Sequence, residues 1–271
     1  GYLRGFFLSS RHRSRIMQVS FDPKEMLGKL SELDKVQLPR AAFIALNQSL
    51  FETRKRLQDE AKNVFNDPVP FTINSFLYEK PKQRGDDLEA RVFVRDDAPK
   101  GNAPSRYLDP QIRGGKHYRT RFQKALGNTP DLDPQGSGGP VLAPNRVMIP
   151  TSSQYVRRNK YGNMSPGQYT QILSALRNAS SADLPSMRRA RGTRNVANRY
   201  FYLNQETVEE MNLRNRAPGV FLQRGRSLYR IMTESRLPTY SGKFKFFDLS
   251  AMSITEEFNK RLRDEFAKFL R

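Results

Sequence analysis

The side chains that could do chemistry are few in this sequence of 271 residues, which has two histidines and no cysteine. His12 and His117 lie in basic, loop-like stretches, and no carboxylate or serine stands at a spacing that would tie it to either ring. Because cysteine is absent, a disulfide framework, a thiol nucleophile and a thiolate metal site are excluded. We therefore expect no catalytic residue, no metal ligand and no cofactor, and the sequence favours a protein that is not an enzyme.

One pair of carboxylates is compatible with a metal site. Asp87 and Glu89 precede Arg91, and a metal-dependent nuclease uses carboxylates to hold the ion and a cation to steady the phosphate. However, Glu89 and Arg91 also occupy the solvent side of an alternating strand, which is the ordinary place for such residues. We keep a divalent-metal nuclease only as an alternative.

The strongest chemical signal is positive charge. The chain carries 47 Lys and Arg against 27 Asp and Glu, a formal net charge of +20. Such an excess disfavours a lone compact monomer and favours an anionic partner, whether nucleic acid, a membrane surface or acidic neighbouring subunits. No run approaches the roughly 20 apolar residues of a membrane-spanning helix, so we expect no membrane span.

Four arginines are concentrated in residues 178–198, a stretch with few apolar residues that we do not expect to pack: Arg188, Arg189, Arg191 and Arg194. They could neutralise phosphates of DNA or RNA, with steep salt dependence. They could equally order against acidic patches of another subunit, and the sequence leaves both possibilities open. Tyrosine and phenylalanine do not alternate with these arginines, so base-specific recognition is not indicated.

These candidates must be positioned by a core, and the longest helical pattern runs from Pro39 to Phe65. Its apolar residues recur at the spacing of one helix face: Phe43, Leu46, Leu50, Leu57, Ala61 and Val64. Pro39 suits the first helical turn, and the run before Pro68 ends the helix. An amphipathic helix of this kind must pack on a sheet or on other helices.

Two hairpins are expected to form a sheet. The first joins strands over Phe71–Glu79 and Leu88–Arg95, and the second joins strands over Gly219–Gln223 and Leu228–Thr233. The alternation of apolar residues predicts that one face of residues 88–95 is buried. The remaining expected elements are helices over Phe21–Val36 (Asp22 as N-cap, then Pro23), Lys116–Leu126, Gly167–Arg177 and Glu206–Leu213, strands over Val141–Pro150, Tyr200–Leu203 and Lys243–Leu249, and a closing helix from Ser253 with a capping box to Glu256.

The sequence therefore predicts an α+β fold. The helix from Pro39 and the helix from Ser253 are expected to pack on one mostly antiparallel sheet that contains both hairpins. Residues 1–16 are predicted to be a basic N-terminal extension, and residues 17–271 a single domain with long insertions at about 96–140 and 178–198.

Several stretches resemble a known family. The C-terminal third has a Pro-Gly-Val-aromatic strand, a basic turn, a Pro-x-Tyr element, an aromatic stretch and an amphipathic helix, carried by Pro218, Gly219, Val220, Phe221, Arg224, Gly225, Pro238, Tyr240, Phe244, Phe246, Phe258, Leu262 and Phe266. The stretch LPRAAFIALNQS, with Asn47, similarly resembles the start of the family's long helix. Both ends of the globular part thus resemble tailed-phage minor tail proteins of the Z type, the tail-completion or head-tail joining family.

This resemblance implies a non-enzymatic virion protein of the phage neck or tail, assembled in the host cytoplasm. Such a protein would form a homo-oligomeric ring, a hexamer or dodecamer, around the DNA channel. Its partners would be the portal, adaptor, terminator or tube proteins, together with packaged DNA bound without sequence preference. The arginines of residues 178–198 are then the first candidates for DNA or partner contact.

A second alternative comes from the N-terminus. Residues 1–17 are basic, contain serine and lack acidic residues, as in a mitochondrial transit peptide. With the net charge, this pattern is also compatible with an RNA-binding component of an organellar ribosome.

Overall fold

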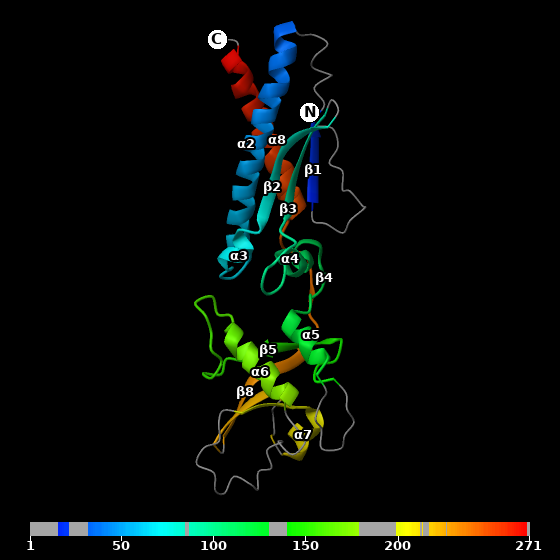
Figure 1. Ribbon diagram of the computed structural model, residues 1–271, viewed down its shortest axis with the longest axis vertical. Coiled ribbons are helices and arrows are strands. Elements are labelled where there is room, and N and C mark those ends of the chain that lie inside the picture. The colour runs from blue at the N-terminus through cyan, green and yellow to red at the C-terminus, as the bar shows by residue number, and fades with distance from the viewer. Residues whose placement is uncertain are drawn as a thin grey trace. The chain divides into compact units, whose positions relative to one another are not determined.

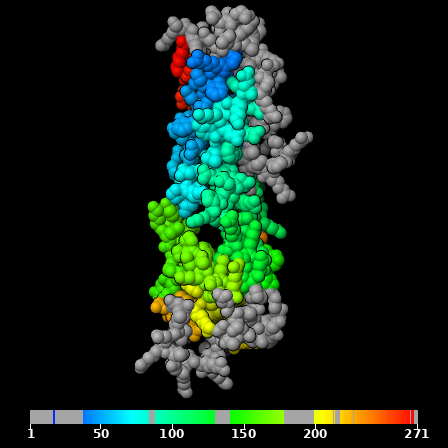
Figure 2. Space-filling view, in the orientation of Figure 1, coloured from blue at the N-terminus to red at the C-terminus, as the bar shows by residue number. Residues whose placement is uncertain are grey.

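The structure is a computed structural model that describes residues 16–21, 32–84, 87–129, 140–178, 199–211, 213, 217–225 and 227–269. Residues 17–271, which the sequence groups into one domain, form two compact units, and each is described by itself. The first unit is Gly1–Gly115 with Tyr240–Arg271, and the second unit is Lys116–Thr239. Helices and antiparallel sheets occur in both units, which confirms the α+β class (Figure 1). Figure 2 shows the described residues in colour and the remaining residues in grey.

The first unit packs two long helices on a three-stranded antiparallel sheet (Figure 1). The helices run antiparallel, because contacts along one proceed backwards along the other: Thr53 meets Ser253, and Gln48 meets Arg261. The elements are α2 (Glu32–Val64), α8 (Phe246–Phe269), the sheet β1 (Ile16–Phe21), β3 (Asp87–Val94) and β2 (Phe76–Arg84) in that order, and the short helices α3 (Pro70–Ile73) and α4 (Pro104–Arg113).

Helix α2 confirms the predicted long helix, but its predicted start was wrong. It begins at Glu32, so Pro39 lies inside the helix. A proline there removes one helical hydrogen bond, while Leu38 and Ala41, on either side of it, are fully buried and stabilise these turns. The buried stripe also differs from the prediction, because Phe43 is 41% exposed and alanines of α2 take its place in the core.

The predicted helix over Phe21–Val36 is contradicted at its start, and its last residues, from Glu32, are helical but belong to α2. Phe21 is the last residue of β1 and lies opposite Leu88 of β3, and Glu32 already belongs to α2. The strand has the period of two that a half-buried strand requires, with apolar residues at Met17, Val19 and Phe21. Residues 22–31 lie outside the described part, as do residues 1–15 of the predicted N-terminal extension.

The first hairpin is confirmed as β2 and β3, with two differences. The alternating residues Leu88, Ala90, Val92 and Val94 are all buried, as predicted. Strand β2 starts later than predicted, because Pro70 opens the helical turn α3, and a bulge shifts the register between Glu79 and Lys82.

The predicted aromatic strand before the closing helix was wrong. Helix α8 begins at Phe246, so Ser253 lies inside it and forms no capping box there. Ser253 is fully buried and accepts a hydrogen bond from Thr53 of α2, and Glu256 pairs with Arg56 at 2.8 Å. An apolar or small residue at every fourth position from Phe246, continuing through Ile254 and Phe258, extends the helix over the aromatic stretch.

The second unit contains a four-stranded antiparallel sheet with helices on it (Figure 1). The second hairpin is confirmed, but it lies in this sheet and not in the sheet of the first hairpin, so the prediction of one shared sheet was wrong. The sheet order is β5 (Arg146–Pro150), β8 (Ser227–Arg236), β7 (Gly219–Arg224) and β6 (Arg199–Leu203), and the helices are α5 (Arg121–Gly127), α6 (Pro166–Asn178) and α7 (Gln205–Glu210).

This sheet is buried on both faces along its inner strand β7. Along β7, Val220 and Leu222 join the core that includes residues of α5 and α6, while Phe221 between them joins a smaller core with Val208 of α7. Burial on both faces explains the continuous apolar run of the strand, because neither face alternates with solvent.

The predicted insertion at 96–140 is partly helical in its described residues. The helix expected over Lys116–Leu126 is α5, which starts later because Thr120 forms a capping box with Gln123. The sequence prediction missed α4, whose Pro104 lies in the first turn and whose Pro110 lies inside. The strands β4 (Gly115–Lys116) and β9 (Thr239–Tyr240) form a two-stranded pair. Of the insertion at 178–198, the structure describes Asn178 alone.

Gly219 is a position where the second hairpin requires glycine. A Cβ atom there would lie 2.1 Å from the carbonyl oxygen of Met232 on β8. We expect Gly219→Ala to lower the free energy of unfolding by about 1–3 kcal/mol, because the strands must separate to admit the methyl group. Urea unfolding measures this, with Gly167→Ala as the control, since that Cβ meets nothing within 4 Å. Equal midpoints for the two variants would contradict the prediction.

Candidate anion-binding site

The arginines singled out in the sequence, Arg188, Arg189, Arg191 and Arg194, lie outside the described residues. They belong to the segment between α6 and β6, and both of these elements line the site described below. Their role in binding DNA or a partner therefore stays a prediction.

The histidine and carboxylate candidates are placed only in part. His12 lies outside the described residues. Burial lowers the pKa of His117 below its ordinary value, against a hydrogen bond with Gln123, so His117 is neutral near pH 7. Glu89 of β3 lies opposite Lys82 of β2 in the sheet register. Within the described ranges, no group of three His, Asp or Glu side chains is arranged to hold a metal ion.

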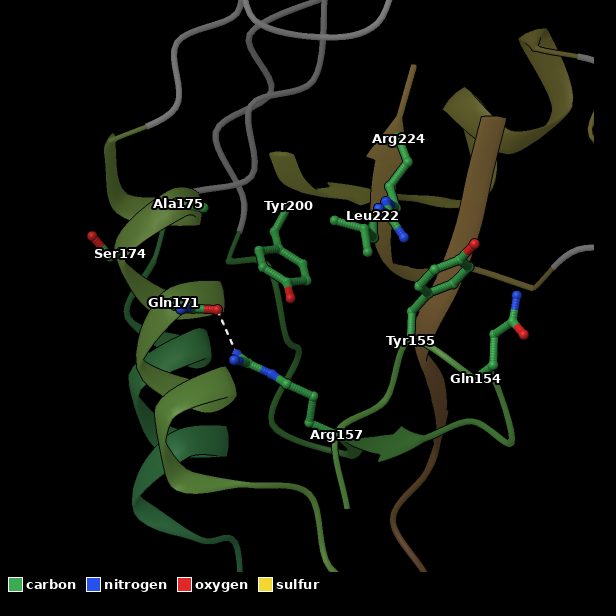
Figure 3. A pocket seen from close by; sticks show the side chains of 9 residues that line it. All are labelled: Gln154, Tyr155, Arg157, Gln171, Ser174, Ala175, Tyr200, Leu222 and Arg224. Carbon is green, nitrogen blue, oxygen red and sulfur yellow. Dashed lines mark hydrogen bonds between the residues drawn. The ribbon is translucent and has the colours of Figure 1, made fainter. Parts of the chain in front are cut away.

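The second unit has an open hollow of about 630 Å³, and none of its described lining residues is one of these candidates. Its walls come from the loop after β5, from α6 and from strands β6 and β7 (Figure 3). We call it the arginine hollow, and its lining residues are Gln154, Tyr155, Arg157, Gln171, Ser174, Ala175, Tyr200, Leu222 and Arg224.

The buried side-chain amide of Gln168 on α6 forms hydrogen bonds with two other walls of the arginine hollow. Gln168 of α6 is fully buried, and its Oε1 accepts a hydrogen bond of 2.7 Å from the backbone N–H of Arg157. Its Nε2 donates to the carbonyl oxygen of Tyr155 at 2.8 Å and to the hydroxyl of Tyr200 at 3.1 Å. The loop, α6 and β6 thus share one set of hydrogen bonds, which positions the side chains of the hollow.

The two arginines of the hollow are held by neutral groups. Arg157 donates a hydrogen bond of 2.5 Å to Oε1 of Gln171 (Figure 3). The guanidinium of Arg224 lies over the ring of Tyr155, 5.1 Å from its centroid, and that ring packs against Tyr229 at 4.3 Å. Neither contact neutralises the positive charge, so both guanidinium groups keep N–H donors for an anion.

The environment of Tyr155 favours negative charge. A hydrogen bond with Tyr229 is the main cause that lowers the pKa of Tyr155 from its ordinary value, and the positive Arg224 acts in the same direction. The positive charge of Arg224 also attracts an external anion.

Acidic residues are scarce throughout the second unit. Its sequence has 20 Lys and Arg against 7 Asp and Glu, and none of these acids lies between residues 134 and 182. Of the four acids in its described part, Glu234 pairs with Arg146 at 3.5 Å, and Glu206, Glu209 and Glu210 lie on α7. Within this described part, neither arginine of the hollow forms an ion pair.

The hollow offers hydrogen-bond donors for binding. The nine described residues that line it include no Asp, Glu or His. Two guanidinium groups, two tyrosines and two glutamine amides instead present hydrogen-bond donors, which suits an anionic group.

Sequence reasoning missed the arginine hollow. Arg224 entered that reasoning only as part of a basic turn, and Arg157 and Gln168 did not enter it at all. The signal that could have found Arg157 is the basic, aromatic run from Tyr155 to Tyr161 within the stretch that lacks acidic residues.

Comparison of the chain with protein-family models finds no match, and neither do the comparisons with curated proteins and with solved structures. In the described part of the chain, no helix has the length and apolar character needed to cross a membrane.

Proposed function

We propose that this chain is a structural protein of a tailed-phage virion, which completes the tail or connects it to the head. It would assemble as a ring around the DNA channel and contact packaged DNA without reading its sequence. The observation that carries the proposal is the excess of 13 positive charges in the second unit, where the described arginines of the hollow lack acidic partners. A polyanion neutralises the excess positive charge of such a surface.

The resemblance to tail-completion proteins supports the same function. The residues that carry it include the core phenylalanines Phe244 and Phe246, which are fully buried, and Gly219, whose position excludes a side chain. They are residues on which packing depends, as expected where a shared fold underlies the resemblance.

A ring also needs contacts between copies. Phe43 and Phe51 of α2 are 41% and 42% exposed, and exposed aromatic residues are enriched at protein interfaces. Neighbouring copies and acidic surfaces of portal, adaptor, terminator or tube proteins would further offset the charge of each chain.

The predicted arginine segment tests the proposal. Replacement of Arg188, Arg189, Arg191 and Arg194 by alanine should leave the unfolding midpoint unchanged and reduce particle assembly or DNA retention at least tenfold, because the phosphate contacts are lost. Infectious titre and the DNA content of purified particles measure the effect. The matched control removes four exposed lysines of the first unit: Lys80, Lys82, Lys100 and Lys260. Unaltered particles from the arginine variant would contradict this role, and the absence of the chain from phage particles would refute the function.

The organellar-ribosome alternative rests on the same positive charge. Co-purification of the chain with ribosomal RNA, and not with phage particles, would favour it.

A further inference from the structure

We propose that the arginine hollow is a binding site for the sugar-phosphate backbone of nucleic acid, with Arg157 and Arg224 as the phosphate ligands. This inference deepens the proposed function, on which it rests for the identity of the ligand as packaged DNA. It adds a defined site in the described part of the second unit.

Both arginines of the hollow have N–H donors available for a phosphate. The guanidinium of Arg224 lies 5.1 Å from the ring centroid of Tyr155, and contact with this one side chain leaves other N–H groups of its five donors for an anion. The hydrogen bond from Arg157 to Gln171 uses one N–H of that side chain and leaves others free. Two such planar forks match the geometry of phosphate oxygens.

The backbone that carries the two arginines is held in place before a ligand binds. The loop that carries Arg157 is fixed to α6 and β6 through the fully buried Gln168. Arg224 is the last residue of β7, next to the turn of the second hairpin. Because both arginines stand on fixed backbone, binding a phosphate loses little additional conformational entropy.

The size and the lining of the hollow also suit a nucleotide. A volume of about 630 Å³ accommodates more than a single inorganic ion. Tyr200 and Leu222 supply an apolar surface between α6 and Tyr155 (Figure 3), and sugars or bases pack on such surfaces. Tyrosine beside arginine is absent from residues 188–194 in the sequence, but the tertiary structure brings the two together here.

The same lining favours nucleic acid over an acidic protein segment. A carboxylate would use only the two arginines. A nucleotide would use the arginines through its phosphate and would also pack its sugar on the partly exposed ring of Tyr155.

Fluorescence anisotropy of the purified full chain with labelled DNA tests the proposal. The probes are two duplexes of about 20 base pairs with unrelated sequences, because packaged phage DNA is double-stranded. We expect equal affinity for both, a drop of at least tenfold for the R157Q/R224Q variant, and a slope of log affinity against log salt that is about 1.8 smaller. The matched control is R106Q/R263Q, which removes the same charge from exposed arginines of the first unit and should change affinity less than twofold.

A second measurement needs no variant. DNA should protect Arg157 and Arg224 of the unchanged chain from modification by phenylglyoxal, as read by mass spectrometry, while Arg106 stays reactive. Unprotected arginines, undiminished binding by R157Q/R224Q, or no binding by the unchanged chain would each overturn the site. Tighter binding of polyglutamate than of DNA, lost in the same variant, would also overturn it in favour of a protein partner. These results are separate from the particle assay, because the chain can belong to a virion without binding DNA in this hollow.

Discussion

Replacing Phe76 by alanine is expected to lower the free energy of unfolding by about 3–5 kcal/mol, the largest single effect that we predict. Phe76 is fully buried at the start of β2, and its ring centroid lies 5.3 Å from that of Phe244 and 6.3 Å from that of Phe246. Alanine would leave a cavity where the sheet meets the start of α8, and the aromatic contacts would be lost with it.

Denaturant unfolding of the purified chain measures this effect. Phe51→Ala is the control within the same unit, because Phe51 is 42% exposed and Lys55 lies over its ring, 4.4 Å from the centroid. We expect that control to cost less than about 1 kcal/mol, since little apolar area leaves the core. Similar losses in both variants would show that the three phenylalanines do not form the centre of this core.

Gln168→Leu is expected to lower the free energy of unfolding by about 2–5 kcal/mol, because the polar groups bonded to the Gln168 amide would lose their hydrogen-bond partner. Leucine would leave the N–H of Arg157 and the carbonyl oxygen of Tyr155, which are partly buried, without their partner. The amide hydrogen of Arg157 should also exchange with solvent at least tenfold faster, which hydrogen-exchange mass spectrometry detects.

Gln171→Leu is the matched control, one turn further along α6. Gln171 is exposed and bonds only to the side chain of Arg157 among the described residues, so we expect a change below about 1 kcal/mol and unchanged amide exchange. If the two leucine variants behave alike, the hollow does not depend on the buried amide.

The two variants are expected to change different properties, the folding of the first unit and the geometry of the arginine hollow. Phe76 determines whether the first unit folds, and its loss should impair every property of the chain in proportion to the unfolded fraction. Gln168 determines the geometry of one site. Its variant should therefore lose DNA binding at temperatures where the protein is still folded.

The sequence by itself determined the fold class and most of the local elements. Periodicity of 3.6 predicted α2 and α6, and alternation predicted the buried face of β3, because one buried side leaves a repeating trace in the chain. The net charge and the absence of cysteine likewise came from the sequence alone, and they restrict the kinds of partner and chemistry.

Boundaries and pairings depended on the tertiary structure. Pro39 and Ser253 look like helix starts locally, yet burial of Leu38 and a hydrogen bond from Thr53 place both inside longer helices. The two hairpins look alike as sequence, and their assignment to separate sheets depends on contacts between residues far apart in the chain.

In the arginine hollow, too, composition and tertiary structure determine different properties. The excess of arginine is a property of composition, but the meeting of Arg157, Tyr155 and Arg224 depends on a loop and a hairpin that are about 70 residues apart in the sequence. Charge adds along a chain regardless of its fold, whereas a binding site requires particular atoms at particular distances, and those are fixed only when the core has packed.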